Sequence, residues 1–352
     1  MAMEVLEVAS KDGMESLRAD WDAAFALDPH ASPFMSWAWH RGWLEVTPFP
    51  WMTLAARESP SSPFVGFLPI SLRGSRSALR IDHLREVHAG GEPTADEAGF
   101  VCVPAMQDRA ISALADHLFQ RLKWDRLRFQ EWNDSRLPTL LSRVPSSMAY
   151  LEQPGTACPW MKLPETWDEF LRGLSSPTRQ SLRRRLRTAE REFRLTIDEG
   201  AAISDPMIAA LIGMAARRTR LEADPHVLRL ETILRRCAND GLVRMVTLWK
   251  GGVPAAGVAG LIDRKRGAWC LYVTSFDEAL ARHSPGRVAI ALAIRDAIVM
   301  KMESFDFLRG EEPYKFQFGA QSRHNRTLII ERPSLQAALR RGISGVRDSL
   351  RI

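Results

Sequence analysis

Residues 283–319 read HSPGRVAIALAIRDAIVMKMESFDFLRGEEPYKFQFG and combine a helix start, an apolar helix, a short strand and a polar loop. At Ser284–Gly286 a hydroxyl that can cap a helix precedes a proline, which has no N–H to leave unsatisfied, and a glycine. The run that follows is apolar on most faces, which predicts a helix over Arg287–Met302 packed deep against a sheet. The strand-like segments Ala268–Ser275 and Ser304–Leu308 flank this helix, and such a crossover is expected to be parallel and right-handed.

The segments before this stretch predict the rest of a mixed α/β fold. In the second half, residue spacing indicates two helices and then three strands joined by hairpin turns, at Asp205–Arg220, Pro225–Asn239, Leu242–Trp249, Val253–Ile262 and Ala268–Ser275. The first half has a weaker version of this order, with helices at Ser36–Val46 and Asp108–Leu122 and strands near Trp51–Arg57, Phe64–Arg73, Leu79–Val87 and Trp124–Trp132. The pattern predicts the α+β class, with two related domains that each have a mixed, mainly antiparallel sheet flanked by helices.

A proline-rich stretch suggests where the two domains meet. The length of 352 residues fits about two domains of ordinary size. Five prolines lie between Pro138 and Pro164, which makes this stretch the best candidate for a linker. We place the boundary near residue 160, which gives domains of residues 1–160 and 161–352.

The positive charge of the chain is concentrated in one segment. The formal net charge is +6, and Arg172–Arg194 hold eight arginines against two glutamates, so this segment carries the whole excess. Within it, Arg179, Arg183, Arg187 and Arg191 recur about every four residues and form one stripe on a helix. The stripe is either a solvated face, the ordinary case for a charge run, or a surface for a phosphate-bearing partner.

The composition argues against several classes of protein. The four cysteines and eight histidines are scattered without CxxC, HxxxH or HExxH spacing, so we expect no metal site, and reduced thiols in a cytoplasmic protein. The first residues lack the basic start and apolar run of a signal peptide. No apolar stretch approaches the roughly 20 residues that a membrane span needs, so we expect no span.

Two groups of residues could carry chemistry. The helix start at Ser284–Arg287 offers free backbone N–H groups and the positive end of the helix dipole, which suit a phosphate or diphosphate; the alternative is an ordinary helix cap. The second group follows the strand and consists of Asp306, Arg309, Gly310, Glu311, Glu312, Tyr314 and Lys315. Polar groups beyond the carboxyl end of a strand are typical of ligand sites in open α/β sheets, and the alternative is a charged surface loop with local ion pairs.

The same residues carry a resemblance to a known family. With Ser284-Pro285-Gly286 before the helix, Asp306 in the strand, and Arg309-Gly310 and Tyr314-Lys315 after it, the segment resembles the C-terminal signature of the CelD-like acetyltransferase family. That family belongs to the Gcn5-related N-acetyltransferase (GNAT) superfamily and is close to the FemAB peptidyltransferases. The resemblance extends over most of residues 32–318, through SPFMSWAWHRGWLEV at 32–46, SSPTRQSLRRRLRTAEREF at 175–193 and KGGVPAAGVAG at 250–260.

The resemblance implies two fused GNAT-like domains, the first of them degenerate, and transfer of an acyl group from coenzyme A to an amine or similar nucleophile. In typical GNAT enzymes a loop of the form Q/R-x-x-G-x-G/A holds the coenzyme A diphosphate at the helix start. Here the corresponding loop is His283-Ser-Pro-Gly286-Arg-Val288, which keeps only the central glycine. The FemAB relatives use aminoacyl-tRNA as the donor instead.

The resemblance also implies roles for single residues. Ser284, Pro285, Gly286, Arg287 and Tyr272 would bind acetyl-CoA or another acyl-CoA, and backbone N–H groups near Tyr272–Ser275 would stabilise the thioester oxygen. Asp306 or Glu311 would act as the general base, and Tyr314 or Tyr272 would protonate the leaving thiolate. Lys315 and Arg309 would hold a phosphate or carboxylate of the substrate. Lys315 is counted with the catalytic residues, and Gly310 is counted with Arg309 among the substrate-binding residues.

We therefore expect a cytoplasmic, acyl-CoA-dependent N- or O-acyltransferase that uses no metal. Its acceptor would be a small molecule or a glycan precursor in cell-surface polysaccharide or cellulose assembly. Two alternatives stay open. One is a FemAB-like transferase that uses aminoacyl-tRNA, and the other is a non-catalytic GNAT-like scaffold in an exopolysaccharide complex.

Overall fold

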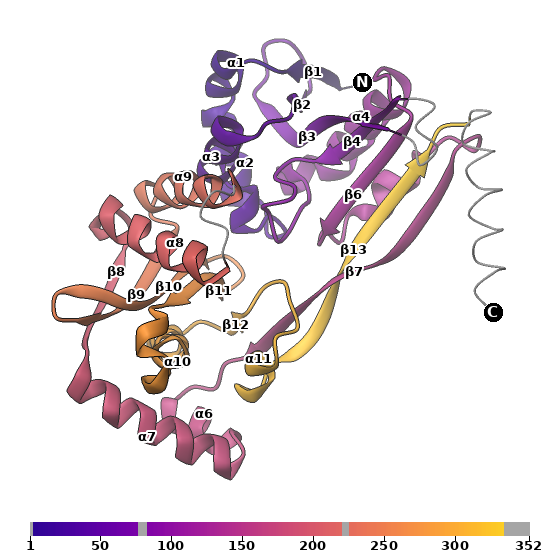
Figure 1. The fold of residues 1–352 in the computed structure, drawn as a ribbon. Coiled ribbons are helices and arrows are strands. Elements are labelled where there is room, and N and C mark those ends of the chain that lie inside the picture. Colours follow the sequence, from indigo (N-terminus) through magenta and orange to yellow (C-terminus); the bar gives the residue numbers. More distant parts are fainter. Residues whose placement is uncertain (1–2, 77–82, 220–224, 334–352) are drawn as a thin grey trace. The chain divides into compact units, whose positions relative to one another are not determined.

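The computed structural model describes residues 3–76, 83–219 and 225–333, and their contacts group them into two compact units (Figure 1). The first unit contains the described parts of Met1–Ala31, Pro48–Gly155 and Asn325–Ile352, and the second those of Ser32–Thr47 and Thr156–His324. The expected cut at residue 160 lies close to the change at Gly155. The grouping departs from domains of residues 1–160 and 161–352 in two places, because 32–47 belong with the second unit and the residues from Asn325 onward belong with the first.

The first unit has the strand order β1-β2-β3-β4-β6-β13, with β5 paired to β3. Neighbouring strands are antiparallel except for β4 and β6, which are parallel. The strands are β1 Glu4–Val8, β2 Trp51–Arg57, β3 Phe64–Arg76, β4 His83–Ala89, β5 Val101–Cys102, β6 Arg126–Trp132 and β13 Gln321–Glu331, which enters this unit at Asn325. The helices are α1 Lys11–Ser16, α2 Arg18–Leu27, η2 Pro104–Met106, α4 Gln107–Gln120 and α5 Leu137–Leu141.

The second unit has the strand order β8-β9-β10-β11-β12-β7. Only the pair of β11 and β12 is parallel. The strands are β7 Ala149–Lys162, which enters this unit at Thr156, β8 Arg194–Glu199, β9 Val243–Lys250, β10 Val253–Asp263, β11 Ala268–Phe276 and β12 Ser304–Asp306. The helices are η1 Pro33–Met35, α3 Trp37–Val46, α6 Trp167–Gly173, α7 Ser176–Glu192, η3 Gly200–Ala202, α8 Asp205–Thr219, α9 Pro225–Asn239, η4 Glu278–His283, α10 Pro285–Val299 and α11 Pro313–Gln317.

The two units repeat one topology. In each, three antiparallel pairs are followed by one parallel pair, whose strands are joined by a crossover through α4 or α10. An antiparallel strand from another part of the chain then completes the order: β13 in the first unit and β7 in the second. The predicted class, a mixed α/β fold of two related and mainly antiparallel units, is therefore confirmed.

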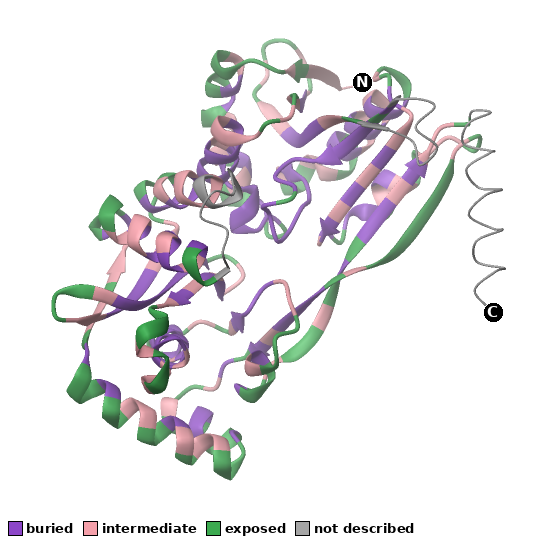
Figure 2. Ribbon diagram, in the orientation of Figure 1, coloured by how far each residue is buried: buried purple, intermediate pink, exposed green. Residues whose placement is uncertain are grey.

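Helix α10 forms the centre of the second unit, as its apolar sequence predicted. Twelve of its fifteen residues are buried, and it packs on β9, β10 and β11 (Figure 2). The one buried charge on it, Asp296, is satisfied by the guanidinium of Arg244 on β9, with Nη2 2.7 Å from Oδ1. Burial on nearly all faces fixes the helix, and hence its first turn, against the sheet.

One prediction of local structure was wrong, and some strands were missed. The proline-rich stretch is not a linker, because it forms α5 and the fourteen-residue strand β7. Pro154 and Pro159 are accommodated in β7, since a proline costs a strand only the one N–H that it cannot donate. Strands β8 and β13 were not predicted at all. β8 directly follows the arginine-rich helix, and its partly exposed residues show no clear alternation.

Candidate functional site

Strands β11 and β12 are paired over only three residues. Ala268–Cys270 lie opposite Ser304–Asp306, but β11 continues to Phe276. Beyond Cys270, the edge of β11 that faces away from β10 has no partner strand within the described parts of the chain. The segment expected from the sequence to stabilise an acyl oxygen, Tyr272–Ser275, lies in this part of β11 beyond the pairing with β12.

The residue that precedes α10 has an unusual backbone conformation. Ser284 has φ 49° and ψ 49°, in the left-handed region, and its side chain makes no capping hydrogen bond. Instead its Oγ accepts a hydrogen bond from the guanidinium of Arg185 on α7. The predicted serine cap is therefore wrong. A side chain in this region costs about 1–2 kcal/mol, and such strain is concentrated at functional sites in proteins.

A cavity of about 290 Å³ lies beside this helix start. Gly286 belongs to its wall, and a Cβ at this position would lie 2.8 Å from Cδ1 of Phe276, so glycine is needed for the ring and the helix to stay this close. No carboxylate is found among the described residues that line the cavity, which are Arg185, Arg218, Thr274, Ser275, Phe276, Ala281, Ser284, Gly286, Arg287, Ile290 and Tyr314. They come from α7, α8, β11, η4, α10 and α11.

Three guanidinium groups give the cavity a positive charge. Arg185, Arg218 and Arg287 form no ion pair with a carboxylate in the described part of the chain, whereas Arg244 and Arg323 of the same unit do. Burial, and then the nearby charge of Arg185, lower the pKa of Arg287 from its ordinary value. Like charges that crowd one cavity without counter-charges favour an anionic ligand.

Ser275 on β11 also belongs to the residues that line this cavity. It is 1% exposed, and its Oγ has no hydrogen-bond partner among the described residues. Neighbouring atoms cover this oxygen, so it does not itself face the cavity.

Tyr314 contributes a protonated phenol to the cavity. Burial, followed by the charge of Glu312, raises its pKa to about 12. The phenol therefore keeps its proton at neutral pH and donates a hydrogen bond rather than exchanging a proton readily.

The other residues predicted after the strand build the loop itself and do not line the cavity. The buried Lys315 donates from Nζ to the carbonyls of Arg309 (2.6 Å) and Gly310 (3.0 Å) and pairs with Glu312 (2.9 Å). Asp306 is 7% exposed; its Oδ1 accepts the amide of Leu308 at 2.8 Å, and its Oδ2 pairs with Arg323 at 2.6 Å.

The structure thus brings together four of the predicted site residues: Ser284, Gly286, Arg287 and Tyr314. Pro285 is buried in the first turn of α10, and the ring of Tyr272 packs edge-on against Phe34, with 5.4 Å between the centroids. Asp306, Arg309, Gly310, Glu311 and Lys315 lie outside the cavity wall. Sequence reasoning missed Arg185, Arg218 and the side chain of Ser275.

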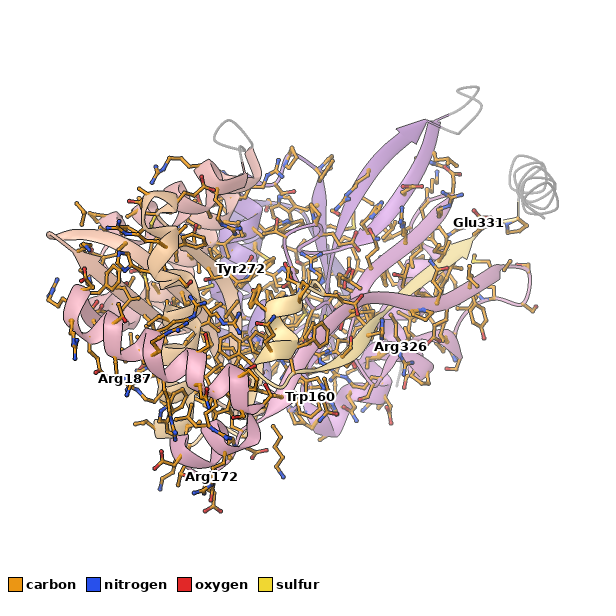
Figure 3. The ribbon with its side chains drawn as sticks, turned by 60° about the horizontal axis from the view of Figure 1, so that its bottom comes forward. Trp160, Arg172, Arg187, Tyr272, Arg326 and Glu331 are labelled. Carbon is orange, nitrogen blue, oxygen red and sulfur yellow. The ribbon has the colours of Figure 1, made fainter. Side chains whose placement is uncertain are left out.

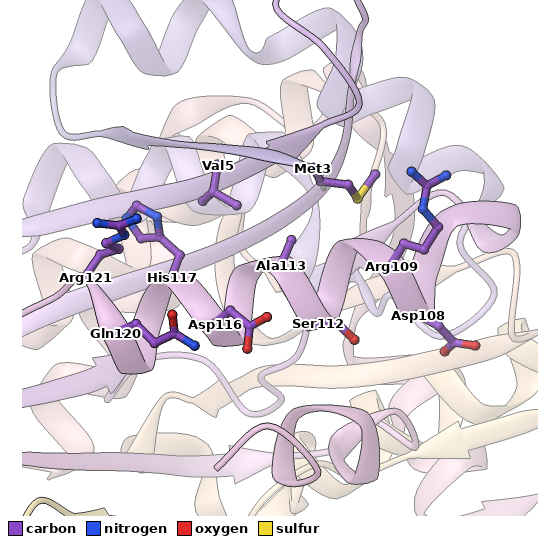
Figure 4. A pocket seen from close by; sticks show the side chains of 10 residues that line it. All are labelled: Met3, Val5, Asp108, Arg109, Ser112, Ala113, Asp116, His117, Gln120 and Arg121. Atoms are coloured by element: carbon purple, nitrogen blue, oxygen red, sulfur yellow. The ribbon is translucent and has the colours of Figure 1, made fainter. Parts of the chain in front are cut away.

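Two other features fit a structural role better. A cavity of about 600 Å³ in the first unit lies along α4 (Figure 4), and three of its charged residues are already paired, His117 with Glu7, Asp116 with Arg143 and Arg109 with Glu58. The arginine stripe on α7 is largely exposed, and Figure 3 labels Arg187 on this helix and Arg172 at the end of α6. Among the described residues there is no cluster of three metal-ligating side chains and no helix long and apolar enough to cross a bilayer.

Comparison with known proteins finds a family that resembles the part of the chain around the cavity. Residues 176–316 match the family model described as acetyltransferase (GNAT) domain. The matched segment includes all the residues that line the cavity beside α10.

Solved structures share the fold of the whole chain. The C-terminal domain of a putative lysylphosphatidylglycerol synthetase from Agrobacterium fabrum is 11% identical, with a TM-score of 0.58 over 95% of this chain and 96% of that one. FemX is 10% identical, with a TM-score of 0.59 over 88% and 95%. Identities this low show a shared fold only. A search of curated proteins gave no match.

Proposed function

We propose that the GNAT domain transfers an acyl group from an acyl-CoA to an amine or hydroxyl of a small-molecule or glycan-precursor acceptor. The observation that carries the proposal is the cavity at the start of α10, with three guanidiniums in its wall that form no ion pair with a described carboxylate. This set of donors fits the diphosphate of coenzyme A, and the bound thioester would supply the activated acyl group. The resemblance to CelD-like proteins supports an acceptor in cell-surface polysaccharide assembly.

Residues of the domain have separate tasks in this proposal. Backbone N–H groups of β11 beyond its pairing with β12 would donate to the acyl oxygen, where negative charge develops during transfer. Tyr314 keeps its phenol proton and donates a hydrogen bond to the sulfur as it leaves with the bonding electrons.

The acceptor must lose a proton as it forms its bond to the acyl carbon, and Glu311 is the better of the two predicted bases. Both carboxylate oxygens of Asp306 are engaged, one by the Leu308 amide and the other by Arg323. Glu311 is exposed in the loop between β12 and α11. We assign the base role to Glu311 and a loop-holding role to Asp306.

Calorimetry with acetyl-CoA and longer acyl-CoAs tests the proposal, together with an assay for free thiol release in the presence of candidate acceptors. The parent should bind at least one acyl-CoA, and Arg287→Met should bind it about tenfold more weakly or worse, since one charge-assisted contact is lost. Arg295→Met is the matched control, because Arg295 lies on the same helix but outside the cavity wall.

Three outcomes would contradict the proposal. A folded parent that binds no acyl-CoA but binds aminoacyl-tRNA would favour the FemAB-like alternative. A parent that binds neither donor would favour the scaffold. Equal binding by the parent and by Arg287→Met would remove the cavity from the donor site.

A further inference from the structure

The loop before α10 lacks a side-chain donor at its first position. His283 stands where typical GNAT loops carry glutamine or arginine. Its ring packs edge-on against Phe193, 6.0 Å between centroids, and its Nε2 accepts a hydrogen bond of 3.0 Å from Arg282. His283 is not part of the cavity wall. The loop itself therefore contributes the single cation Arg287 to the cavity.

A second helix provides the missing charge. Arg185 lies on α7 next to the face by which this helix packs on the core, formed by Leu182, Leu186 and Ala189. Its side chain is half-buried, reaches the cavity and donates to Oγ of Ser284, the strained residue before α10. Neighbouring Arg184 is exposed and does not line the cavity.

Building on the proposed function, we propose that Arg185 determines specificity for a diphosphate-bearing donor. It supplies from α7 the cation that the first loop position lacks, and it holds Ser284 in the conformation that presents the start of α10. Arg185, Arg218 and Arg287 together face a ligand group that carries two negative charges, which matches the diphosphate diester of an acyl-CoA. A ligand without phosphates would leave these like charges uncompensated.

The experiment is a calorimetric titration of the full chain and its variants with four probes. Inorganic diphosphate measures binding of the diphosphate group alone. Acetyl-CoA and uridine diphosphate are two ligands that contain this group, and S-acetylpantetheine carries the thioester without phosphates. Arg185→Met keeps the length of the side chain and removes its charge. Arg184→Met is the matched control, and Ser284→Ala removes the hydroxyl contact while leaving the charge of Arg185 in place.

We expect Arg185→Met to weaken binding of inorganic diphosphate and of acetyl-CoA by about ten- to a hundredfold, the loss typical of one charge-assisted contact. Binding of S-acetylpantetheine should stay within about twofold of the parent, as should every probe with Arg184→Met. Ser284→Ala should show a smaller loss than Arg185→Met. Melting temperatures of all variants should match the parent, because Arg185 pairs with no buried carboxylate.

The outcomes separate this inference from the proposed function. If the parent binds inorganic diphosphate but not acetyl-CoA, and Arg185→Met loses the diphosphate binding, the inference stands and the acyl-CoA proposal is rejected. Binding of uridine diphosphate then tests whether a nucleotide is the source of the diphosphate. Acetyl-CoA binding that is equally strong in the parent and in Arg185→Met would keep the function and overturn the inference. An equal loss for S-acetylpantetheine would also overturn it.

Discussion

Ser275 tests whether an unsatisfied buried hydroxyl beside the cavity affects stability or binding. In the free protein its buried Oγ has no partner in the described parts of the chain, so Ser275→Ala should leave the free energy of unfolding unchanged or raise it by up to about 1 kcal/mol. Acyl-CoA affinity should stay within about twofold of the parent, because neighbouring atoms cover the Oγ. Urea unfolding and calorimetry measure the two effects. A marked loss of affinity would show that the hydroxyl reaches the bound ligand.

Substitution of Asp306 and of Glu311 tests which of the two carboxylates acts as the general base. Asp306→Asn breaks a largely buried ion pair with Arg323, so it should lower the free energy of unfolding by about 1–3 kcal/mol, with turnover per folded molecule little changed. Glu311→Gln should lower kcat about a hundredfold with an unchanged melting temperature, as expected for loss of a general base at an exposed position. Thermal melts and initial rates decide between them, and the reverse pattern would return the base role to Asp306.

Single site residues could be predicted from the sequence where local backbone conformation determines their position, and could not be predicted where tertiary contacts do. Gly286 and Arg287 could be predicted from the pattern of a helix start. Arg185 could have been found, since it lies three residues after Leu182 and four before Ala189, beside the apolar face; the stripe through Arg183 and Arg187 instead drew attention to the solvated side. Arg218 carries no such signal, because only the packing of α8 brings it to the cavity.

At the scale of elements, α3 holds a neutral histidine in the second unit. The ring of His40 is 1% exposed and meets Trp39 and Trp43 edge-on, with centroids 5.5 and 6.2 Å away. Burial lowers its pKa to about 3. Above pH 6.5 the ring is neutral in both the folded and unfolded chains. Below that pH the unfolded chain takes up a proton that the folded chain refuses, so stability is lost as the pH falls towards 3.

We expect His40 to account for up to about 5 kcal/mol of destabilisation between pH 6.5 and 3, since each pKa unit corresponds to about 1.4 kcal/mol. His40→Leu cannot take up this proton, so its stability should fall less steeply over the same range. Urea unfolding of both proteins at several pH values gives the difference, in which the contribution of carboxylates common to both cancels. Parallel curves would mean that His40 is protonated in the folded protein.

The elements of the second unit could be predicted closely because their periodicity is local. The helices Asp205–Thr219 and Pro225–Asn239 and the hairpin between Lys250 and Val253 follow from helical spacing and from two glycines with positive φ. β7 and β13 could not, because each takes its partner from a segment far away along the chain. The sequence of such a strand does not show which distant strand it pairs with.

For the whole molecule, the distribution of charge separates the two possible donors. The segment Arg172–Arg194 carries the entire excess of +6, and the rest of the chain is neutral. An extended nucleic-acid channel needs basic groups on several elements, because affinity for a polyanion grows with the number of phosphates neutralised. The exposed stripe on α7 offers one short row, whereas the wall of the cavity beside α10 contains three arginines from three helices.

We therefore predict different salt responses for the two ligands. Acyl-CoA binding depends on a few charges, so it should weaken only several-fold between about 50 and 200 mM salt, and any binding of bulk tRNA should be weak and not saturable. Calorimetry for acyl-CoA and fluorescence anisotropy for tRNA give both curves. The double variant Arg183→Glu/Arg187→Glu reverses the charge of the stripe without touching the cavity, so it should leave acyl-CoA affinity nearly unchanged, while Arg287→Met lowers it. Saturable tRNA binding that falls steeply with salt and disappears in the double variant would reverse this ranking, because it would make the stripe the site of a polyanion.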